Sequence, residues 1–213
     1  MHIPIAQPSL GNEESDAVLT VLASGMIAQG PVTAAFEEEF AAYCGIPHAV
    51  AVSNGTTALH AALLATGVGP GDEVVVPAFT FFATASSVSM CGARPVFADV
   101  DAATATIDPA DVLAKVTPKT KAVIGVHLYG QPCEAGAIRE ICNDKGLVFI
   151  EDAAQAHGAT YRGQKTGSLG DLACFSFYAT KNLATGEGGM VTTASDDYDQ
   201  HLRRVINLSL IHI

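Results

Sequence analysis

Residues 48–66 read H-A-V-A-V-S-N-G-T-T-A-L-H-A-A-L-L-A-T, and this segment indicates the fold class most clearly. Its first five residues form a short apolar run that is typical of a buried strand, and the alanine- and leucine-rich residues 56–66 predict a helix. Ser53, Asn54 and Gly55 between them indicate a tight turn that leads directly into that helix. A buried strand followed at once by a helix is the repeating unit of parallel sheets.

The same alternation continues along the chain. Strands are expected over residues 73–76, 95–100, 121–127, 147–151, 172–177 and 190–193. Helices are expected over residues 13–24, 33–43, 80–91, 109–115, 134–145 and 196–207, and a hairpin-like turn is expected at residues 161–163. We therefore predict an α/β fold, a three-layer and mainly parallel sheet with helices on both faces.

The composition limits the classes of function. The 213 residues are 49% apolar and 15% charged, as in a well-buried enzyme domain, and the net charge of −11 argues against a nucleic-acid partner or an anionic membrane. Residues 74–93 carry no charge, but Pro77 and several hydroxyl side chains favour a strand and a helix over a membrane span. The N-terminus lacks the features of a secretory signal. The five cysteines form no C-x-x-C pair, which predicts reduced thiols in a cytoplasmic protein, and the seven histidines show no metal-ligand spacing, so no metal is expected.

Lys181 stands out within residues 176–189, S-F-Y-A-T-K-N-L-A-T-G-E-G-G. It lies between an apolar strand and a glycine-rich turn. A lysine in such surroundings can be held partly neutral, which a Schiff-base nucleophile requires. Taken alone, the segment favours a lysine that extends from a strand end into water.

Three further groups follow predicted strands. Gly55, Thr56 and Thr57 open a helix and could bind a phosphate, or could simply form a helix cap. Asp152 ends an apolar strand, where it could meet a pyridinium nitrogen or cap a helix. Among Phe79, Phe81 and Phe82 one ring could stack on a flat cofactor, with core packing expected for the other two. Together with Lys181, these groups fit pyridoxal 5′-phosphate.

The chain resembles the DegT/DnrJ/EryC1/StrS family of sugar aminotransferases, which use pyridoxal phosphate on the aspartate-aminotransferase fold (fold type I). The resemblance is carried by S-G-M-I-A-Q-G-P, S-N-G-T-T-A-L, P-A-F-T-F-F-A-T-A, H-L-Y-G-Q-P, E-D-A-A-Q-A-H-G, G-S-L-G-D, S-F-Y-A-T-K and G-E-G-G-M, in order from about residue 24 to residue 204.

The resemblance implies a role for each candidate residue. Lys181 would form the Schiff base with the cofactor and move the proton between the substrate carbon and cofactor C4′, and Asp152 would pair with the pyridine nitrogen. Gln155 would lie at the phenolic-oxygen side of the ring. Phe81 would stack on the ring. The phosphate would be held by Gly55, Thr56, Thr57 and Ser176. The family transfers an amino group, usually from glutamate, to a keto carbon of a nucleotide-linked deoxysugar.

The resemblance also implies an organisation. Residues 1–207, with the N-terminal helices in residues 1–46, are expected to form the cofactor-binding large domain of a homodimer. Residues 208–213 are expected to be an artefactual tail, and the family's C-terminal small domain is expected to be absent. Two alternative functions stay open: a keto-sugar 3-dehydratase of the same family, which carries histidine at the lysine position, and a non-catalytic fragment that binds the cofactor or a nucleotide-sugar.

Overall fold

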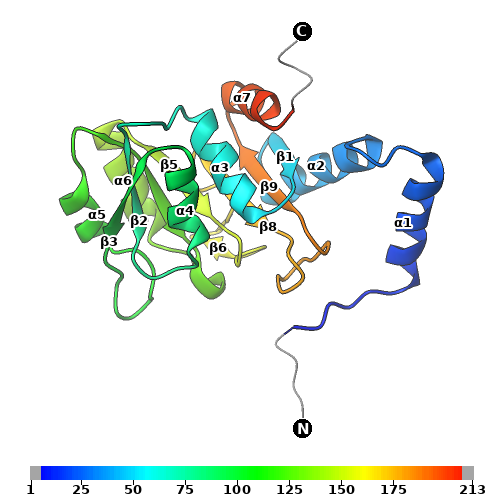
Figure 1. Ribbon diagram of the computed structural model, residues 1–213. Coiled ribbons are helices and arrows are strands. Elements are labelled where there is room, and N and C mark those ends of the chain that lie inside the picture. The colour runs from blue at the N-terminus through cyan, green and yellow to red at the C-terminus, as the bar shows by residue number, and fades with distance from the viewer. Residues whose placement is uncertain (1–5, 208–213) are drawn as a thin grey trace.

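The computed structural model describes residues 6–207 (Figure 1). The helices are α1 (Asn12–Ser24), α2 (Pro31–Cys44), α3 (Gly55–Ala65), α4 (Ala83–Met90), α5 (Pro109–Lys115), α6 (Ala135–Lys145) and α7 (Asp196–Ile206), with a short 3₁₀ turn, η1 (Leu128–Gly130). The strands are β1 (His48–Val52), β2 (Glu73–Pro77), β3 (Arg94–Ala98), β4 (Thr120–Val126), β5 (Val148–Asp152), β6 (Thr160–Tyr161), β7 (Gln164–Lys165), β8 (Leu172–Ser176) and β9 (Gly189–Thr193). The expected artefactual tail, residues 208–213, lies outside the described residues.

Seven strands form one sheet in the order β1-β9-β8-β5-β4-β2-β3, and β6 and β7 form a separate hairpin. Neighbouring strands from β8 to β3 pair in parallel, whereas β9 is antiparallel to both β1 and β8. The prediction of a mainly parallel α/β sheet is confirmed, with β9 as the strand of opposite direction. Since β1, β2, β4, β5 and β8 run the same way, the segments that follow them meet at one edge of the sheet.

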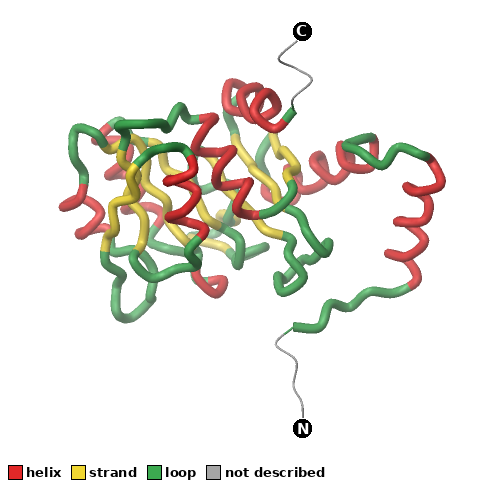
Figure 2. Tube along the Cα trace, in the orientation of Figure 1, coloured by secondary structure: helices red, strands yellow, loops and turns green. Residues whose placement is uncertain are grey.

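Helices cover both faces of this sheet (Figure 2). On one face, α3, α4 and α7 pack on strand residues that include Val50, Val76, Ile124 and Ile150. On the other face, α5 and α6 pack near β3 and β4, and α2 packs near β8 and β9. The core therefore has three layers, and the strand residues are buried from both sides, which explains why their sequences are continuously apolar.

Local chemistry sets where several helices begin. Asn54 and Asp108 accept hydrogen bonds from the first-turn amides of α3 and α5, and Ser195 does the same for α7. Pro31 and Pro109 occupy the first turns of α2 and α5, where a missing N–H group costs nothing. The helices start close to the predicted residues because caps and first-turn prolines are encoded locally.

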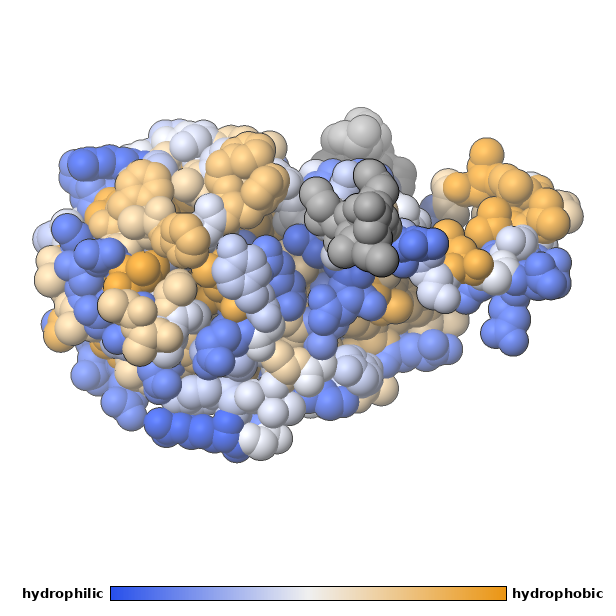
Figure 3. All heavy atoms as spheres, turned by 90° about the horizontal axis from the view of Figure 1, so that it is seen from below, coloured by the Kyte–Doolittle hydropathy of each residue, from blue (hydrophilic) through white to orange (hydrophobic). Residues whose placement is uncertain are grey.

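Helix α1 lies apart from the layers (Figure 1). None of its residues is buried, and Val18, Leu19 and Leu22 are each more than half exposed. Figure 3 shows apolar side chains gathered at the end of the molecule where α1 lies. Within residues 6–207, no helix combines the length and the apolar character needed to cross a bilayer. All five cysteines are buried and unpaired.

Candidate functional site

The turn after β1 lies against the end of β8. Val52, Gly189 and Ser176 occupy one row across β1, β9 and β8. A Cβ atom on Gly55 would come within 2.7 Å of the Ser176 Cβ, and one on Gly189 would overlap the backbone of Asn54. These two glycines therefore let the start of α3, the start of β9 and the buried Ser176 come together at the sheet edge.

The start of α3 presents free backbone donors beside Ser176. Asn54 Oδ1 accepts the N–H of Thr57 at 2.9 Å, and Thr57 Oγ1 donates to the Asn54 carbonyl at 2.8 Å. Both polar groups of Thr57 are thus engaged in the cap. The amides of Gly55 and Thr56 have no partner among residues 6–207, as expected for a helix start, and they form the part of this turn that is free to hold an anion.

Asp152 ends β5 as a buried carboxylate, 6% exposed. Its Oδ2 accepts the hydroxyl of Thr84 at 2.8 Å, and its Oδ1 accepts the amide of Ala154 at 3.2 Å. Burial raises the pKa of Asp152, while these two hydrogen bonds and the charge of Lys181 act in the opposite direction. No lysine or arginine pairs with Asp152 among the described residues. A buried acid in this position suits a cationic ligand group.

Lys181 lies half-buried in the loop between β8 and β9, where its backbone amide donates to the Tyr178 carbonyl. His157 lies nearby and packs against the rings of Phe175 and Phe177. Neither ring nitrogen of His157 has a hydrogen-bond partner within the described range. The pKa of His157 is lowered to about 4, mainly by burial and also by the charge of Lys181. His157 therefore stays neutral beside the lysine.

Gln155 reaches from the segment after β5 to the segment after β4. Its Oε1 accepts the backbone N–H of Tyr129 at 2.7 Å. Tyr129 has a left-handed backbone (φ 54°) and is 79% exposed, so the glutamine secures a strained turn. With its oxygen engaged, Gln155 has its amide NH₂ group available for a ligand.

The three phenylalanines after β2 are all exposed, at 53% for Phe79, 62% for Phe81 and 69% for Phe82. The expectation that Phe79 and Phe82 pack in the core is wrong. The reason is that α4 begins at Ala83 rather than at Thr80, so the rings lie in the preceding loop and not on a helix face. The rings of Phe81 and Phe82 contact each other, with centroids 4.6 Å apart.

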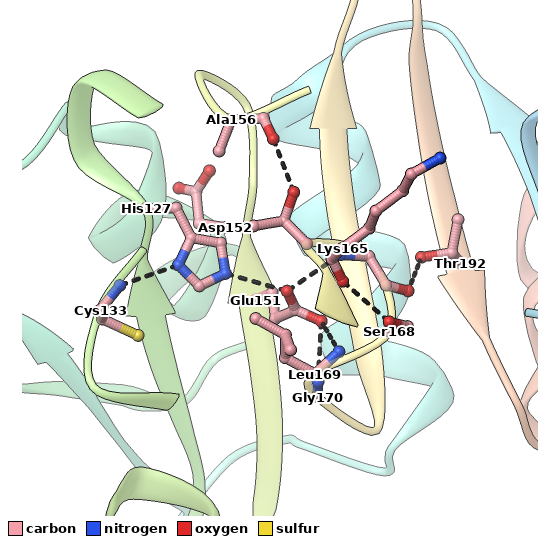
Figure 4. Close-up of polar contacts among 12 residues, drawn as sticks. His127, Cys133, Glu151, Asp152, Ala156, Lys165, Ser168, Leu169, Gly170 and Thr192 are labelled. Atoms are coloured by element: carbon pink, nitrogen blue, oxygen red, sulfur yellow. Dashed lines mark hydrogen bonds and ion pairs between the residues drawn. The ribbon is translucent and has the colours of Figure 1, made fainter. Parts of the chain in front are cut away.

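Glu151 and His127 form a buried polar cluster that sequence reasoning missed (Figure 4). Both side chains are fully buried, and His127 Nε2 lies 2.9 Å from Glu151 Oε2. The amide of Cys133 donates to His127 Nδ1 at 3.1 Å, so the ring proton lies on Nε2 and is donated to Glu151. Glu151 also accepts three backbone amides, those of Gly167, Leu169 and Gly170. The E-D and G-S-L-G-D motifs are thus linked by one carboxylate.

The sheet edge therefore combines a helix start with free amides, a buried acid, an amide donor and a lysine. The ends of β1, β5 and β8 bring Gly55, Thr56, Asp152, Ser176 and Lys181 to one side of the sheet. Phe81 reaches the same edge on the loop before α4, whose first turn contacts Asp152 through Thr84. Among residues 6–207, no group of three or more His, Cys, Asp or Glu side chains could hold a metal ion.

The sequence model of the DegT/DnrJ/EryC1/StrS aminotransferase family matches residues 8–211. This chain belongs to that family. The resemblance stated from the motifs is confirmed, and the matched range includes all the candidate residues.

Named relatives agree with this assignment. The chain is 52% identical over 203 residues to GDP-perosamine synthase from Caulobacter vibrioides, covering 95% of this chain and 55% of that protein. The structure of DesI in the presence of its TDP-sugar product matches with a TM-score of 0.89 at 38% identity, covering 94% of this chain and 51% of that one. The PLP-form of the sugar aminotransferase Spr1654 from Streptococcus pneumoniae matches with a TM-score of 0.91 at 33% identity, covering 95% of this chain and 57% of that one. This chain spans about half the length of the curated relatives it matches.

Proposed function

We propose that this protein uses pyridoxal 5′-phosphate to transfer an amino group from glutamate to a keto carbon of a nucleotide-linked deoxysugar. The product would serve the synthesis of a surface polysaccharide or another glycan in the cytoplasm. The observation that carries the proposal is the buried Asp152 carboxylate, which forms no ion pair with a lysine or arginine among residues 6–207, at the same sheet edge as Lys181 and the start of α3. Relatives named for a GDP-sugar and a TDP-sugar support a nucleotide-sugar substrate.

The residues present fit this cofactor at each end. The free amides of Gly55 and Thr56 with the hydroxyl of Ser176 suit the phosphate, since a helix start favours an anion. Thr57 would support this turn through its cap. Asp152 suits the protonated pyridine nitrogen, because burial takes the carboxylate out of water and a nearby positive charge stabilises its ionised form. Phe81 would stack on the ring, and the Gln155 amide would donate at the phenolic side.

When bound, the cofactor supplies an electron-withdrawing ring that stabilises negative charge at the substrate carbon. The chain supplies the remaining steps. Lys181 Nζ would hold the cofactor until the amino donor replaces it, and would then take a proton from the donor carbon and deliver it to cofactor C4′. Asp152 would keep the ring nitrogen protonated throughout. Neutral His157 beside Lys181 would not compete for that proton, because its pKa is about 4.

We further propose that residues 1–207 form the cofactor-binding large domain and that the protein works as a homodimer. Five aromatic side chains near the sheet edge are between 46% and 79% exposed and would suit coverage by a second copy: Phe79, Phe81, Phe82, Tyr129 and Tyr178. Analytical ultracentrifugation tests the dimer, and a monomer at micromolar concentration contradicts it.

Glutamate titration separates turnover from binding. Wild-type protein loaded with the cofactor should lose its visible absorbance band on addition of glutamate and regain it on addition of the keto-sugar substrate from a panel of nucleotide keto-sugars. Lys181→Ala should bind the cofactor without this cycle. A wild-type band that glutamate leaves unchanged supports a non-catalytic binder instead. Lys181 itself argues against the 3-dehydratase, which carries histidine there.

A further inference from the structure

Thr84 is a fully buried hydroxyl that faces the proposed cofactor site. It lies in the first turn of α4, and its side chain is 0% exposed. Its hydroxyl donates to Asp152 Oδ2 at 2.8 Å, across a separation of 68 residues in sequence. The half-buried Thr80 has its own hydroxyl 3.3 Å from the Thr84 oxygen, so it can donate to Thr84 while Thr84 donates to Asp152.

The two hydrogen bonds on Asp152 hold both of its oxygens. Oδ2 takes the Thr84 hydroxyl, and Oδ1 takes the Ala154 amide at 3.2 Å. One donor comes from α4 and the other from the chain that continues β5, so the plane of the carboxylate is set by two separate elements. An ionised carboxylate can accept further hydrogen bonds while keeping these two.

We propose that Thr84 is a positioning residue of the cofactor site, whose hydroxyl orients Asp152 and keeps it ionised opposite the pyridine nitrogen. The inference rests on the proposed function, because it assigns the partner of that nitrogen. Thr84 does not itself touch the cofactor in this role. It acts through Asp152.

The groups around Asp152 set its pKa, and Thr84 is the main one that keeps the carboxyl ionised. Burial raises the pKa of Asp152, and the largest opposing influence is the hydrogen bond from Thr84. The charge of Lys181, in the segment that follows β8, also lowers this pKa. Cys174 faces Asp152 from β8, but burial raises the pKa of its thiol well above the usual value, so the thiol stays neutral. Without the threonine hydroxyl, the carboxyl shifts toward its protonated form, which is a poorer partner for a pyridinium.

Thr84→Val removes the hydroxyl at nearly constant shape, and Thr84→Ser restores it. Ser87→Ala is the matched control, because Ser87 is equally buried in α4 but donates only to the Thr84 carbonyl. The readouts are the Kd for pyridoxal phosphate, the ¹⁵N shift of the ring nitrogen in labelled cofactor, and the ¹³C titration of the Asp152 carboxyl in cofactor-free protein. Asp152→Asn assigns that last signal.

The expected result is a Kd increase of about 10-fold for Thr84→Val, because the carboxylate opposite the ring nitrogen loses the donor that orients it and keeps it ionised. The ring nitrogen should move toward its unprotonated shift, and Asp152 should titrate at higher pH. Thr84→Ser and Ser87→Ala should match wild type. A Thr84→Val protein with wild-type ¹⁵N shift and wild-type Asp152 titration overturns the inference. A wild type that binds no cofactor overturns the proposed function instead, and the carboxyl titration then still decides whether Thr84 controls Asp152.

Discussion

Replacing Glu151 by glutamine tests whether the buried carboxylate holds the site segments together. Each Glu151 oxygen accepts two hydrogen bonds: Oε1 from the amides of Leu169 and Gly170, and Oε2 from Gly167 and His127. A glutamine side chain replaces one oxygen by an NH₂ group. The two groups that donated to the replaced oxygen then face an NH₂ group, which is itself a donor.

The expected decrease in the free energy of unfolding follows from the loss of that acceptor. A buried donor left without a partner costs about 1–3 kcal/mol, so two of them lower the free energy of unfolding by about 2–6 kcal/mol. The His127 ring cannot easily compensate. If its Nε2 gave up the proton to accept from the new amide, Nδ1 would carry it and would face the Cys133 amide. The destabilisation is expected in the segment that carries Asp152 and in the 166–170 loop.

Urea unfolding followed by far-UV circular dichroism measures the difference. Glu73→Gln is the matched control, because Glu73 is only 7% exposed but contacts the Thr117 hydroxyl and the largely exposed Arg94. The control should lose less than about 1 kcal/mol, since a glutamine can keep the Thr117 contact and exposed ion pairs contribute little. Equal midpoints for Glu151→Gln and Glu73→Gln, with equal slopes, would show that the hydrogen bonds of Glu151 do not hold these segments together.

Three further outcomes follow from the same structure. Gly55→Ala should weaken binding of pyridoxal phosphate and destabilise the fold by about 1–3 kcal/mol, because its Cβ meets Ser176 at 2.7 Å; isothermal titration and urea unfolding check this, and unchanged values contradict it. His157 has a folded-state pKa of about 4, below the unfolded value of about 6.5, so the unfolded state binds a proton more readily than the folded state. Its contribution to the free energy of unfolding is therefore fully present above pH 6.5, and that free energy falls by up to about 3 kcal/mol as the pH drops toward 4. His157→Phe should flatten that part of the stability–pH curve, and an unchanged slope argues against a buried neutral ring. Asp152→Asn should retain the fold yet bind the cofactor with an unprotonated ring nitrogen, visible as a changed ¹⁵N shift; a wild-type shift would remove Asp152 from its proposed role.

Much of the fold could be predicted because its signals are local. The run His48–Val52 is a strand with the predicted bounds, and α5 starts at Pro109, the first residue of the helix predicted over residues 109–115. The direction of β9 was not predicted, although a signal existed. The connection from β8 contains no helical pattern, and a parallel neighbour needs a crossover of a dozen or more residues, usually a helix.

The site was harder to predict where it depends on contacts between distant segments. Thr84 and Asp152 lie in separate motifs, and neither motif alone indicates that a hydroxyl of one meets a carboxylate of the other. The same holds for His127 and Glu151, which meet only because β4 and β5 are neighbours. The error at Phe79 and Phe82 has another cause. Apolar rings predict burial on average, but a loop at a sheet edge can hold them in solvent.

Lys181 is the lysine expected to carry the cofactor at this sheet edge. Protein loaded with pyridoxal phosphate, reduced with borohydride and digested with protease should yield one labelled peptide, with the added mass on Lys181. Lys165 provides an internal comparison, because its Nζ donates to the Tyr43 carbonyl away from the site and should stay unlabelled. Label spread over several lysines, or absent from Lys181, would contradict the account.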